Sequence, residues 1–579
     1  MSAIVTSAFS VSETEKPLPP LPKHWLSLGH AFIHQVKTRP HALAMVDSTG
    51  INLTYQQTFE RAVALANLIR DDIGACSSNV GILMPPSCGA AIANLALTFL
   101  GRIPVNLNYM ASKKEFESFI NQARIQHVLT SEKVLSKFKF ETTAAFLPVE
   151  VLQNKLTFTL KALSWIEAAA MPTELLGTIF PGLDPHQTDP STGDKNYRNL
   201  LDEVATIIYT AGSTAEPKGV LLTHRNILSN IQAIQLKAGI MDKEVVLGVM
   251  PFFHSFGFTL TLWAVLALGH TAVYHFNPLD GRTVGSLCLS HAASILFCTP
   301  TIMRSYLKRC SHEEFKSLKL CILGGEELKP QLAKDLQEKL GITVLAGYGL
   351  TETAPVIACN VPGIIKLADG RLVAGNRPGT VGTVLPGTEV RITSDTSDEL
   401  AAGQEGMLFV RGPQVMKGYL HNPHETEKVL QNGWFRTGDV GYRDADGFIT
   451  ITGRLTQFAK IGGEMVSLPR IEQEILRIIK KDEQCLSVTS VPDCSRGERL
   501  VVVYTDLGMP LSELIQRLKE AEISRLWIPV VQDFVPVDAL PVLGNGKLDL
   551  RKIKDMAELA KPVNSVRHMG ISSDFPFDL

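Results

Sequence analysis

Several features that would assign the chain to a specialised class of protein are absent from its 579 residues. The nine cysteines are odd in number and form no C-x-x-C pair, and the fifteen histidines form no H-E-x-x-H arrangement. Neither a disulfide framework nor a common zinc site is indicated, and reduced thiols are expected. The 56 Lys and Arg residues are balanced by 58 Asp and Glu residues, so no basic excess predicts binding to nucleic acid.

Uninterrupted apolar runs of membrane-spanning length are absent as well. Residues 89–107 and 258–276 come closest, but polar residues such as Arg102 and His270 interrupt them. Both are expected to be buried helix-and-strand units. Residues 1–25 have no basic start and no long apolar core, which predicts a flexible lead-in and not a secretory signal. A cytoplasmic protein is therefore expected, and peripheral membrane contact stays open.

The length predicts two to four domains or subdomains. From residue 26 to about 378, apolar patterns at helical spacing alternate with short strand patterns, which predicts parallel sheets covered by helices. Residues 154–199 interrupt this rhythm and are expected to form a long surface connection. Residues 379–453 contain short strands and frequent glycine turns, which predict a small β-barrel subdomain.

Residues 454–561 again mix helices and strands and predict a separate, smaller α+β domain, followed by an irregular tail over 562–579. The predicted fold class is therefore α/β. It comprises a large N-terminal domain over 26–453, with two βαβ-type sheets and the small β-barrel, and the smaller C-terminal domain.

One loop suits a polyphosphate. An apolar run over 207–209 stops there, and a second apolar run follows it. The loop contains Thr210, Gly212, Ser213 and Thr214 and ends at Lys218. Hydroxyls, free backbone N–H groups and an ammonium can hold phosphate oxygens. The order Lys218-Gly219 entering a strand differs from a Walker A loop, and a plain turn between two strands is the alternative.

Further polar clusters follow downstream, and each is weak alone, because a turn or a solvated lysine is the commoner explanation. A short apolar run precedes Gly324, Gly325 and Glu326. AGYGLTETAPV contains Tyr348, Gly349, Thr351 and Glu352. NGWFRTGDVGYRDADGFITITGR contains Asp439 and Arg454, and PVLGNGKLDLRK contains Lys547.

Together and in this order, these clusters resemble the adenylate-forming superfamily of acyl-CoA synthetases, luciferases and peptide-synthetase adenylation domains, over residues 26–556. FAKIGGEMVSLPRIEQEI and GYGLTETAPVIACNVP are most similar to acyl–acyl carrier protein synthetases, a group that includes the synthetase half of 2-acylglycerophosphoethanolamine acyltransferase. The resemblance implies ATP and Mg²⁺ as cofactors. A fatty carboxylate would attack the α-phosphate of ATP, and a phosphopantetheine thiol would then attack the acyl-adenylate.

The resemblance also implies roles for the residues that match its motifs. The loop from Thr210 to Lys218 would hold the β- and γ-phosphates, Thr351 the α-phosphate and Glu352 the Mg²⁺ ion. Tyr348, in the Gly-Tyr-Gly turn with Gly349, would lie against the adenine, with Gly324, Gly325 and Glu326 near its other side. Asp439, assisted by Arg454, would bind the ribose hydroxyls, and Lys547 would bridge the α-phosphate and the carboxylate.

In this superfamily the C-terminal domain rotates between the two half-reactions, so that Lys547 leaves and a face with Gly462-Gly463 enters. The position that matches the hinge is Thr456, where Asp or Lys is usual. Ala211 and Ala215 also stand where Ser and Gly are commoner in the phosphate loop. Because Ser213, Thr214 and Lys218 are present, an active enzyme is expected.

The acyl substrate is predicted from MPFFHSFGF, in which His254 occupies the place of an acidic residue of amino-acid-activating members. A substrate ammonium would be left unpaired there, which disfavours amino acids. His254 and Phe256 are therefore predicted to contact an apolar acyl chain. A half-buried histidine bonded to a backbone group is an equally open alternative.

The sequence leaves alternatives open for the thiol acceptor and for the type of activity. Holo acyl carrier protein is preferred on the resemblance, with Arg470, Lys480 and Lys481 as candidate contacts to its acidic surface; CoA is the first alternative. An enzyme that shares only the first half-reaction and a non-catalytic scaffold that binds acyl chains or nucleotide are further alternatives. His275 and Asp280 have the His-x4-Asp spacing of lysophospholipid acyltransferases, which is interpreted as coincidence.

Overall fold

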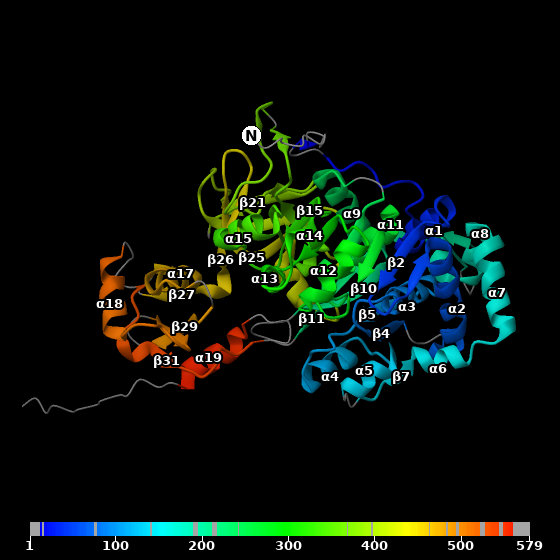
Figure 1. Cartoon of the computed structure of the whole chain (residues 1–579), viewed down its shortest axis with the longest axis horizontal. Coiled ribbons are helices and arrows are strands. Elements are labelled where there is room, and N and C mark those ends of the chain that lie inside the picture. The colour runs from blue at the N-terminus through cyan, green and yellow to red at the C-terminus, as the bar shows by residue number, and fades with distance from the viewer. Residues whose placement is uncertain are drawn as a thin grey trace, which may run out of the picture. The chain divides into compact units, whose positions relative to one another are not determined.

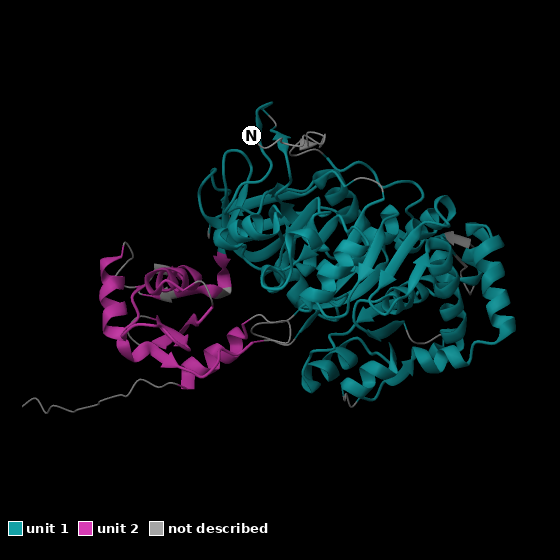
Figure 2. Cartoon of the chain, in the orientation of Figure 1, with its two compact units in different colours: residues 1–452 teal, residues 453–579 magenta. Residues whose placement is uncertain are grey.

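The computed structural model describes most of the chain. The described residues are 12–13, 17–74, 78–138, 142–188, 195–210, 217–240, 243–367, 369–394, 398–461, 464–481, 484–493, 497–521, 527–542 and 548–559. The chain divides into two compact units, residues 1–452 and 453–579 (Figure 2). Within the described residues, no helix is long and apolar enough to cross a membrane.

Unit 1 is built around a nine-stranded sheet in the order β20-β17-β16-β15-β14-β12-β13-β2-β3. Two of its strands, β2 and β15, are labelled in Figure 1. Its strands are β2 (Leu43–Asp47), β3 (Asn52–Thr54), β12 (Val245–Gly248), β13 (Thr271–Tyr274), β14 (Ile295–Cys298), β15 (Leu320–Leu323), β16 (Val344–Gly349), β17 (Val356–Cys359) and β20 (Thr383–Val384). The neighbours from β2 to β16 run parallel. Every residue of β14 and β15 is buried, as expected for parallel strands covered on both faces.

A second, fully parallel sheet has the order β5-β4-β6-β7. Its strands are β4 (Asn79–Leu83), β5 (Ile103–Asn106), β6 (His127–Thr130) and β7 (Ala145–Pro148). The helices before the site region are α1 (Leu28–Thr38), α2 (Tyr55–Ile73), α3 (Cys88–Phe99), α4 (Lys113–Gln122), α5 (Glu132–Lys137) and α6 (Val149–Asn154). The predicted βαβ rhythm is confirmed by these two sheets.

The later helices of unit 1 include α9 (His224–Ala238), α10 (Ser255–Gly257), α11 (Ala264–Leu268), α12 (Gly281–Ser290), α13 (Pro300–Leu307), α14 (His312–Phe315) and α15 (Pro330–Leu340). A π-helical segment, Phe258–Trp263, joins α10 to α11, and all of its residues are buried. The two apolar stretches noted in the sequence are therefore a buried helix followed by a strand in each case, α3 with β5 and α11 with β13.

The prediction of a long surface connection over 154–199 is wrong for its first half. That half contains α7 (Phe158–Ala170) and α8 (Thr173–Ile179), and Phe180 beyond them is fully buried. The turn signals that suggested a loop belong to the later part, which holds η1 (Pro181–Leu183), β8 (His186–Thr188) and β9 (Lys195–Tyr197).

Two further antiparallel sheets of unit 1 carry candidate site residues or their neighbours. The smaller contains β10 (Val204–Thr210), β11 (Lys218–Thr223) and β23 (Gly418–Tyr419). The larger contains β21 (Glu389–Thr393), β22 (Gly406–Arg411), β24 (Leu430–Gln431), β25 (Trp434–Arg443) and β26 (Ile449–Arg454). This five-stranded sheet occupies the region where the glycine-rich sequence predicts a small β-barrel.

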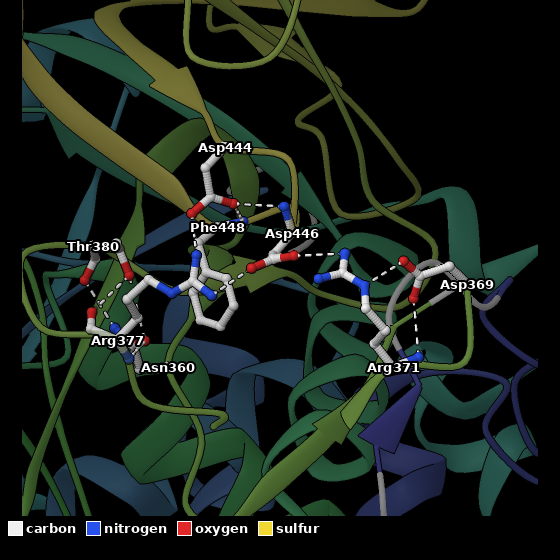
Figure 3. A network of polar contacts seen from close by, with 8 residues as sticks. All are labelled: Asn360, Asp369, Arg371, Arg377, Thr380, Asp444, Asp446 and Phe448. Atoms are coloured by element: carbon white, nitrogen blue, oxygen red, sulfur yellow. Dashed lines mark hydrogen bonds and ion pairs between the residues drawn. The ribbon is translucent and has the colours of Figure 1, made fainter. Parts of the chain in front are cut away.

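A polar network ties the turn between β25 and β26 to the connection that precedes β20 (Figure 3). The guanidinium of Arg377 is paired with Asp444 and lies 2.7 Å from Asp446, and it stacks 4.0 Å from the ring centre of Phe448. Arg371 reaches the same Asp446 at 2.8 Å. These contacts fix the end of β25, the strand that carries Asp439, against the nine-stranded sheet.

Unit 2 has its own five-stranded sheet and its own core. Its strands are β27 (Phe458–Ile461), β28 (Glu464–Ser467), β29 (Leu486–Asp493), β30 (Gly497–Tyr504) and β31 (Phe534–Pro536). Its helices include α17 (Leu468–Ile479), α18 (Leu511–Glu520) and α19 (Leu550–Leu559). Ile471 and Ile475 of α17 are fully buried against the sheet, as apolar residues at helical spacing predict.

Candidate functional site

Several candidate residues follow parallel strands of the nine-stranded sheet. His254 and Phe256 follow β12, Gly324 to Glu326 follow β15, and Tyr348 and Gly349 end β16. Because the carboxyl ends of parallel strands meet at one edge, these residues lie along the same edge of the sheet. Open α/β sheets bind their ligands at this edge.

Phe256 and Gly324 are direct neighbours at that edge. A Cβ added to Gly324 would lie 3.6 Å from the Phe256 ring, and that ring lies 6.1 Å from the ring of Phe297 on β14. The ring of His254 lies 4.5 Å from that of Phe253 and is half-buried. The residue predicted to contact the acyl chain therefore touches the turn predicted to lie near the adenine.

Glu326 is bonded to the helix that follows β14. Its carboxylate accepts hydrogen bonds from the backbone N–H and the hydroxyl of Thr301, at 3.1 and 2.7 Å. Thr301 lies in the first turn of α13, so Glu326 also acts on the positive end of that helix. The contact joins the turn after β15 to helix α13, which follows the neighbouring strand β14.

Tyr348 and Asp439 are brought together from two different sheets. The Tyr348 hydroxyl at the end of β16 donates a hydrogen bond of 2.5 Å to Asp439 Oδ2 on β25. Asp439 is only 2% exposed. A buried carboxylate beside a phenol ring can accept bonds from a diol while the ring covers a flat base.

The turn that carries Thr351 and Glu352 is fixed from both sides. A Cβ on Gly349 would lie 2.0 Å from the carbonyl oxygen of Pro355, so only glycine fits there. The Leu350 N–H donates to the same oxygen at 3.0 Å, across the short helix η4 (Thr351–Thr353). The positions of the two candidate residues are therefore set by the backbone.

Lys218 and Glu352 belong to one connected cluster. Lys218 Nζ lies 2.6 Å from Glu425 Oε2 and 5.0 Å from the ring centre of Tyr419. The Tyr419 hydroxyl donates to Glu352 Oε1 at 2.8 Å. Burial raises the pKa of Tyr419, and the neighbouring Glu352 carboxylate raises it further. Hydrogen bonds from Lys218 and Lys428 lower the pKa of Glu425 to about 2, so this carboxylate stays charged.

Tyr419 and Glu425 were missed by sequence reasoning. Glu425 lies 207 residues from Lys218, and no local pattern indicates that pairing. One signal was available for the helix that carries it, α16 (Pro423–Val429). Asn422 precedes Pro423, and its side chain accepts from the Glu425 N–H at 3.1 Å, the pattern of a helix start.

Some predicted residues lie outside the described residues. These are Gly212, Ser213, Thr214, Lys547 and the pair Gly462-Gly463. Thr210 is described and is paired with Lys218 in the ladder between β10 and β11. Arg454 ends β26, and Thr456 lies in η5 (Leu455–Gln457) immediately after it.

The described residues contain no group of three or more His, Cys, Asp or Glu side chains that could hold a metal ion. A single carboxylate such as Glu352 nevertheless suits Mg²⁺, which keeps several waters and takes other oxygens from substrate phosphates. The donor set beside Lys218 therefore fits a magnesium–polyphosphate group better than a protein-enclosed metal.

Two other sequence features have local structural roles. Asp280 accepts bonds from the N–H and hydroxyl of Thr283 at the start of α12, and Ser48 is 2.8 Å from His275 Nδ1. In unit 2, Lys481 pairs with Asp506 at 2.5 Å and Arg470 lies 5.0 Å from the ring centre of Trp527. None of these contacts needs a lysophospholipid or a carrier protein to explain it.

Comparison with known proteins gives a family match and full-length relatives. A family described as AMP-binding enzyme matches residues 32–420, more than half of the chain. A long-chain-fatty-acid–CoA ligase of Bacillus subtilis (strain 168) is 27% identical over 556 residues, covering 92% of this chain and 95% of the relative. A feruloyl-CoA synthase of Amycolatopsis sp is 26% identical over 525 residues, which cover 90% of this chain and 97% of the relative.

Solved structures share the fold. ATP-bound MatB from Rhodopseudomonas palustris has a TM-score of 0.72 at 23% identity, covering 93% of this chain and 100% of that chain. MenE, the o-succinylbenzoate CoA synthetase of Bacillus subtilis, in complex with ATP and a magnesium ion, has a TM-score of 0.72 at 22% identity, covering 91% and 99%. The predicted α/β class, with a large and a smaller domain, is confirmed by this likeness.

Proposed function

Because the chain belongs to the AMP-binding enzyme family, we propose that it is an ATP-dependent ligase that activates a fatty acid as its acyl-adenylate and transfers the acyl group to CoA. The adenylate-forming superfamily inferred from the motifs is confirmed by the family match. The fatty acid and the thiol acceptor are the finer parts of the proposal and rest on further arguments.

CoA replaces the carrier protein preferred on sequence grounds. The relatives reported above are named as a long-chain-fatty-acid–CoA ligase and a feruloyl-CoA synthase, and both names specify CoA. Arg470 and Lys481 are also engaged by Trp527 and Asp506, which weakens the sequence argument for an acidic carrier. Both acceptors end in the same phosphopantetheine thiol, so the proposed chemistry is unchanged.

The observation that carries the proposal is the cluster in which Tyr419 links Lys218 to Glu352. Adenylation brings a carboxylate against a polyphosphate, so the reaction needs cations where negative charge accumulates. We assign Lys218 to the β- and γ-phosphates and Thr351 to the α-phosphate. Glu352 would hold Mg²⁺, which when bound neutralises phosphate charge. The Tyr419 hydroxyl orients Glu352 by its 2.8 Å bond.

The nucleoside would be held at the neighbouring pair. Asp439 would accept hydrogen bonds from the ribose hydroxyls, with Arg454 assisting, and the Tyr348 ring would cover the adenine beside Gly324, Gly325 and Glu326. The Tyr348 hydroxyl already donates to Asp439 and thereby fixes the carboxylate for this role. Phe256, against Gly324, extends the same edge towards an apolar acyl chain.

The proposed reaction has two balanced steps. The fatty carboxylate oxygen forms a bond to the α-phosphorus, the bond to the β-phosphate oxygen breaks, and pyrophosphate leaves. Lys547 would stabilise the charge shared by the carboxylate and the α-phosphate. The thiol sulfur of CoA then bonds to the acyl carbon, its proton is released, and AMP leaves.

A two-acceptor assay read by mass spectrometry tests the proposal. The purified chain is supplied with palmitate, ATP and Mg²⁺, and either CoA or holo acyl carrier protein is added in separate reactions. Palmitoyl-CoA without acylated carrier is expected. Acylated carrier alone would show that acyl carrier protein, and not CoA, is the thiol acceptor. Palmitoyl-AMP alone would restrict the chain to the first half-reaction. Absence of all three products would contradict the proposed function and favour a binding scaffold.

A further inference from the structure

Helix α7 turns two polar side chains inward and its large apolar residues outward. Ser164 and Glu167 are 2% and 5% exposed, and both accept hydrogen bonds from the Asn67 amide of α2, at 3.1 and 2.7 Å. By contrast, Phe158 is 86% and Trp165 58% exposed. A surface helix normally has the opposite arrangement. Packing against the core therefore explains Ala168 but not the large exposed apolar residues of α7.

The outward residues form one continuous apolar face. Phe158, Ala162, Trp165, Ile166 and Ala169 share that face at the 3.6-residue period of a helix. None of them is charged, and Leu163 at its margin is 48% exposed. Figure 1 shows α7 at the outer edge of unit 1, with α2 on its inner side.

The exposed charge that α7 itself contributes is positive. Lys161 is exposed beside Phe158 and Trp165, whereas Glu167, the other charged residue of α7, is buried on the opposite face. Lys155, just before the helix, is exposed as well, but its ammonium is paired with Asp72 of α2 at 3.1 Å. An apolar face with Trp and Phe and with Lys161 beside it matches the anionic headgroups and the acyl boundary of a phospholipid bilayer.

The dimensions also favour a bilayer over a protein partner. A helix of 13 residues is about 20 Å long and roughly 10 Å wide. That area is about a quarter of the ~800 Å² that each partner contributes to a standard protein interface. Shallow insertion into a membrane surface needs only one such strip.

We propose that α7 docks the protein on an anionic phospholipid surface, with Phe158, Trp165 and Ile166 inserted below the headgroups and Lys161 among them. The helix lies in the interface plane, since no described helix is suited to spanning a membrane. This inference concerns a surface and does not depend on which thiol accepts the acyl group.

The test uses the full chain and vesicles of phosphatidylethanolamine with phosphatidylglycerol in a flotation assay. The double variant Phe158→Ser/Ile166→Ser changes residues that are 86% and 50% exposed, so the bonds to Asn67 remain. Its partition onto vesicles is expected to fall at least about tenfold. The matched control, Leu289→Ser/Leu372→Ser, changes exposed leucines on α12 and β19 (Leu372–Ala374) and should float like the wild type.

Fluorescence gives an independent readout of the same geometry. Brominated lipids quench tryptophans that enter the bilayer. Of the other tryptophans, Trp25 and Trp263 are buried in the core, and Trp434 and Trp527 are partly buried, with Arg391 and Arg470 over their rings. Quenching by vesicles is expected in the wild type and is expected to disappear in Trp165→Phe, which still floats because phenylalanine preserves the apolar face.

Three outcomes would overturn the proposal. The wild type could fail to float, the double variant could float unchanged, or quenching could persist without Trp165. A dimer that dissociates in the double variant, measured by sedimentation without vesicles, combined with no flotation of the wild type, would assign the face to a second copy instead. Equal thermal midpoints of wild type and variants establish that the α7 variants are folded.

Discussion

Lys218 has two neighbours that compete with a phosphate for its ammonium. Glu425 pairs with it at 2.6 Å, and the face of Tyr419 lies 5.0 Å away. The proposed polyphosphate would take over part of that pairing, because it carries more negative charge than one carboxylate. The Tyr419 ring would keep its contact. If Lys218 binds the polyphosphate as proposed, Glu425 would hold the lysine side chain in place in the free protein and would weaken its interaction with ATP.

Glu425→Gln is therefore expected to tighten ATP binding by up to about fivefold, the range of a partly exposed ion pair. The pKa of Glu425 is lowered to about 2, so the carboxylate is charged throughout the pH range of an assay and the effect should not change between pH 6 and 8. Titration calorimetry with ATP measures it, and AMP, which has no β- or γ-phosphate, is the control ligand. Weaker ATP binding in the variant would show that Glu425 positions Lys218 and does not compete.

Asp439→Asn is expected to weaken ATP binding by roughly tenfold to a hundredfold, because a hydrogen bond to a charged acceptor contributes about 1.5–3 kcal/mol. Tyr348→Phe removes only the hydroxyl that orients Asp439, so it should weaken ATP binding less, by roughly fivefold. Both values come from direct titration of ATP. Since Asp439 is buried, an unchanged thermal midpoint is the required control. Unaltered affinity in folded Asp439→Asn would refute the ribose assignment.

At the scale of elements, the site depends on how three sheets are fixed to each other. β16 supplies Tyr348, β25 supplies Asp439, and the hairpin of β10 and β11 supplies Lys218. The Arg377 network holds the turn after β25, and β23 pairs Tyr419 with Val220 of β11. The site geometry is therefore a consequence of sheet-to-sheet contacts.

Arg377→Ala should lower the thermal midpoint by a few degrees, since it removes the pairs to Asp444 and Asp446 and the contact with Phe448. Hydrogen bonds from Arg377 and then Arg371 lower the pKa of Asp446 in the folded state. Because the pKa of Asp446 is lower in the folded state than in the unfolded state, its charged carboxylate stabilises the fold at pH values above the unfolded pKa of about 3.9. This stabilisation is lost as the pH falls from about 3.9 through the lower pKa of the folded state. The difference in thermal midpoint between Arg377→Ala and the wild type should thus be constant from pH 8 to 5 and should become smaller below about pH 4.

The control for Arg377→Ala is Lys334→Ala, which removes an exposed pair with Glu338 at 3.8 Å and should leave the midpoint unchanged. Thermal unfolding followed by circular dichroism measures both variants. A difference in thermal midpoint between Arg377→Ala and the wild type that grows as the pH falls would contradict the assigned role of the aspartates.

Sequence reasoning succeeded where local chemistry decides the structure. The run Leu320–Leu323 is apolar throughout and forms the buried parallel strand β15, followed by the predicted glycine turn. It failed for α7, because the Pro, Gly and Asp residues around 181–193 led the whole stretch 154–199 to be interpreted as a surface connection. It also missed Tyr419, since the bond to Glu352 spans 67 residues and exists only once three sheets are assembled.

At the scale of the whole molecule, the proposed reaction uses residues of both compact units. Lys218, Thr351, Glu352 and Asp439 belong to unit 1, and Lys547 belongs to unit 2. Arg454 and Thr456 lie just after the division at residue 453. A reaction whose first step needs Lys547 and whose second step does not would allow the two units to act differently in each step.

Lys547→Ala is therefore expected to slow adenylation by roughly 10²–10³-fold, the usual effect of removing one group that stabilises transition-state charge. Transfer from preformed palmitoyl-AMP to CoA should stay within a few-fold of the wild type, because no pyrophosphate leaves in that step. ATP–pyrophosphate exchange measures the first step, and palmitoyl-CoA formation from the supplied adenylate measures the second.

The matched control is Lys552→Ala, another lysine of unit 2, whose side chain is 69% exposed and 3.7 Å from Asp549. This variant should retain both activities. If Lys547→Ala lost both steps equally, the lysine would act on the structure of unit 2 or on both reactions, and the division of labour between the steps would be wrong. If exchange were normal, the charge-stabilising role would belong to another cation of the site, and Lys218 would be the first to test because it already lies within the Glu352 cluster.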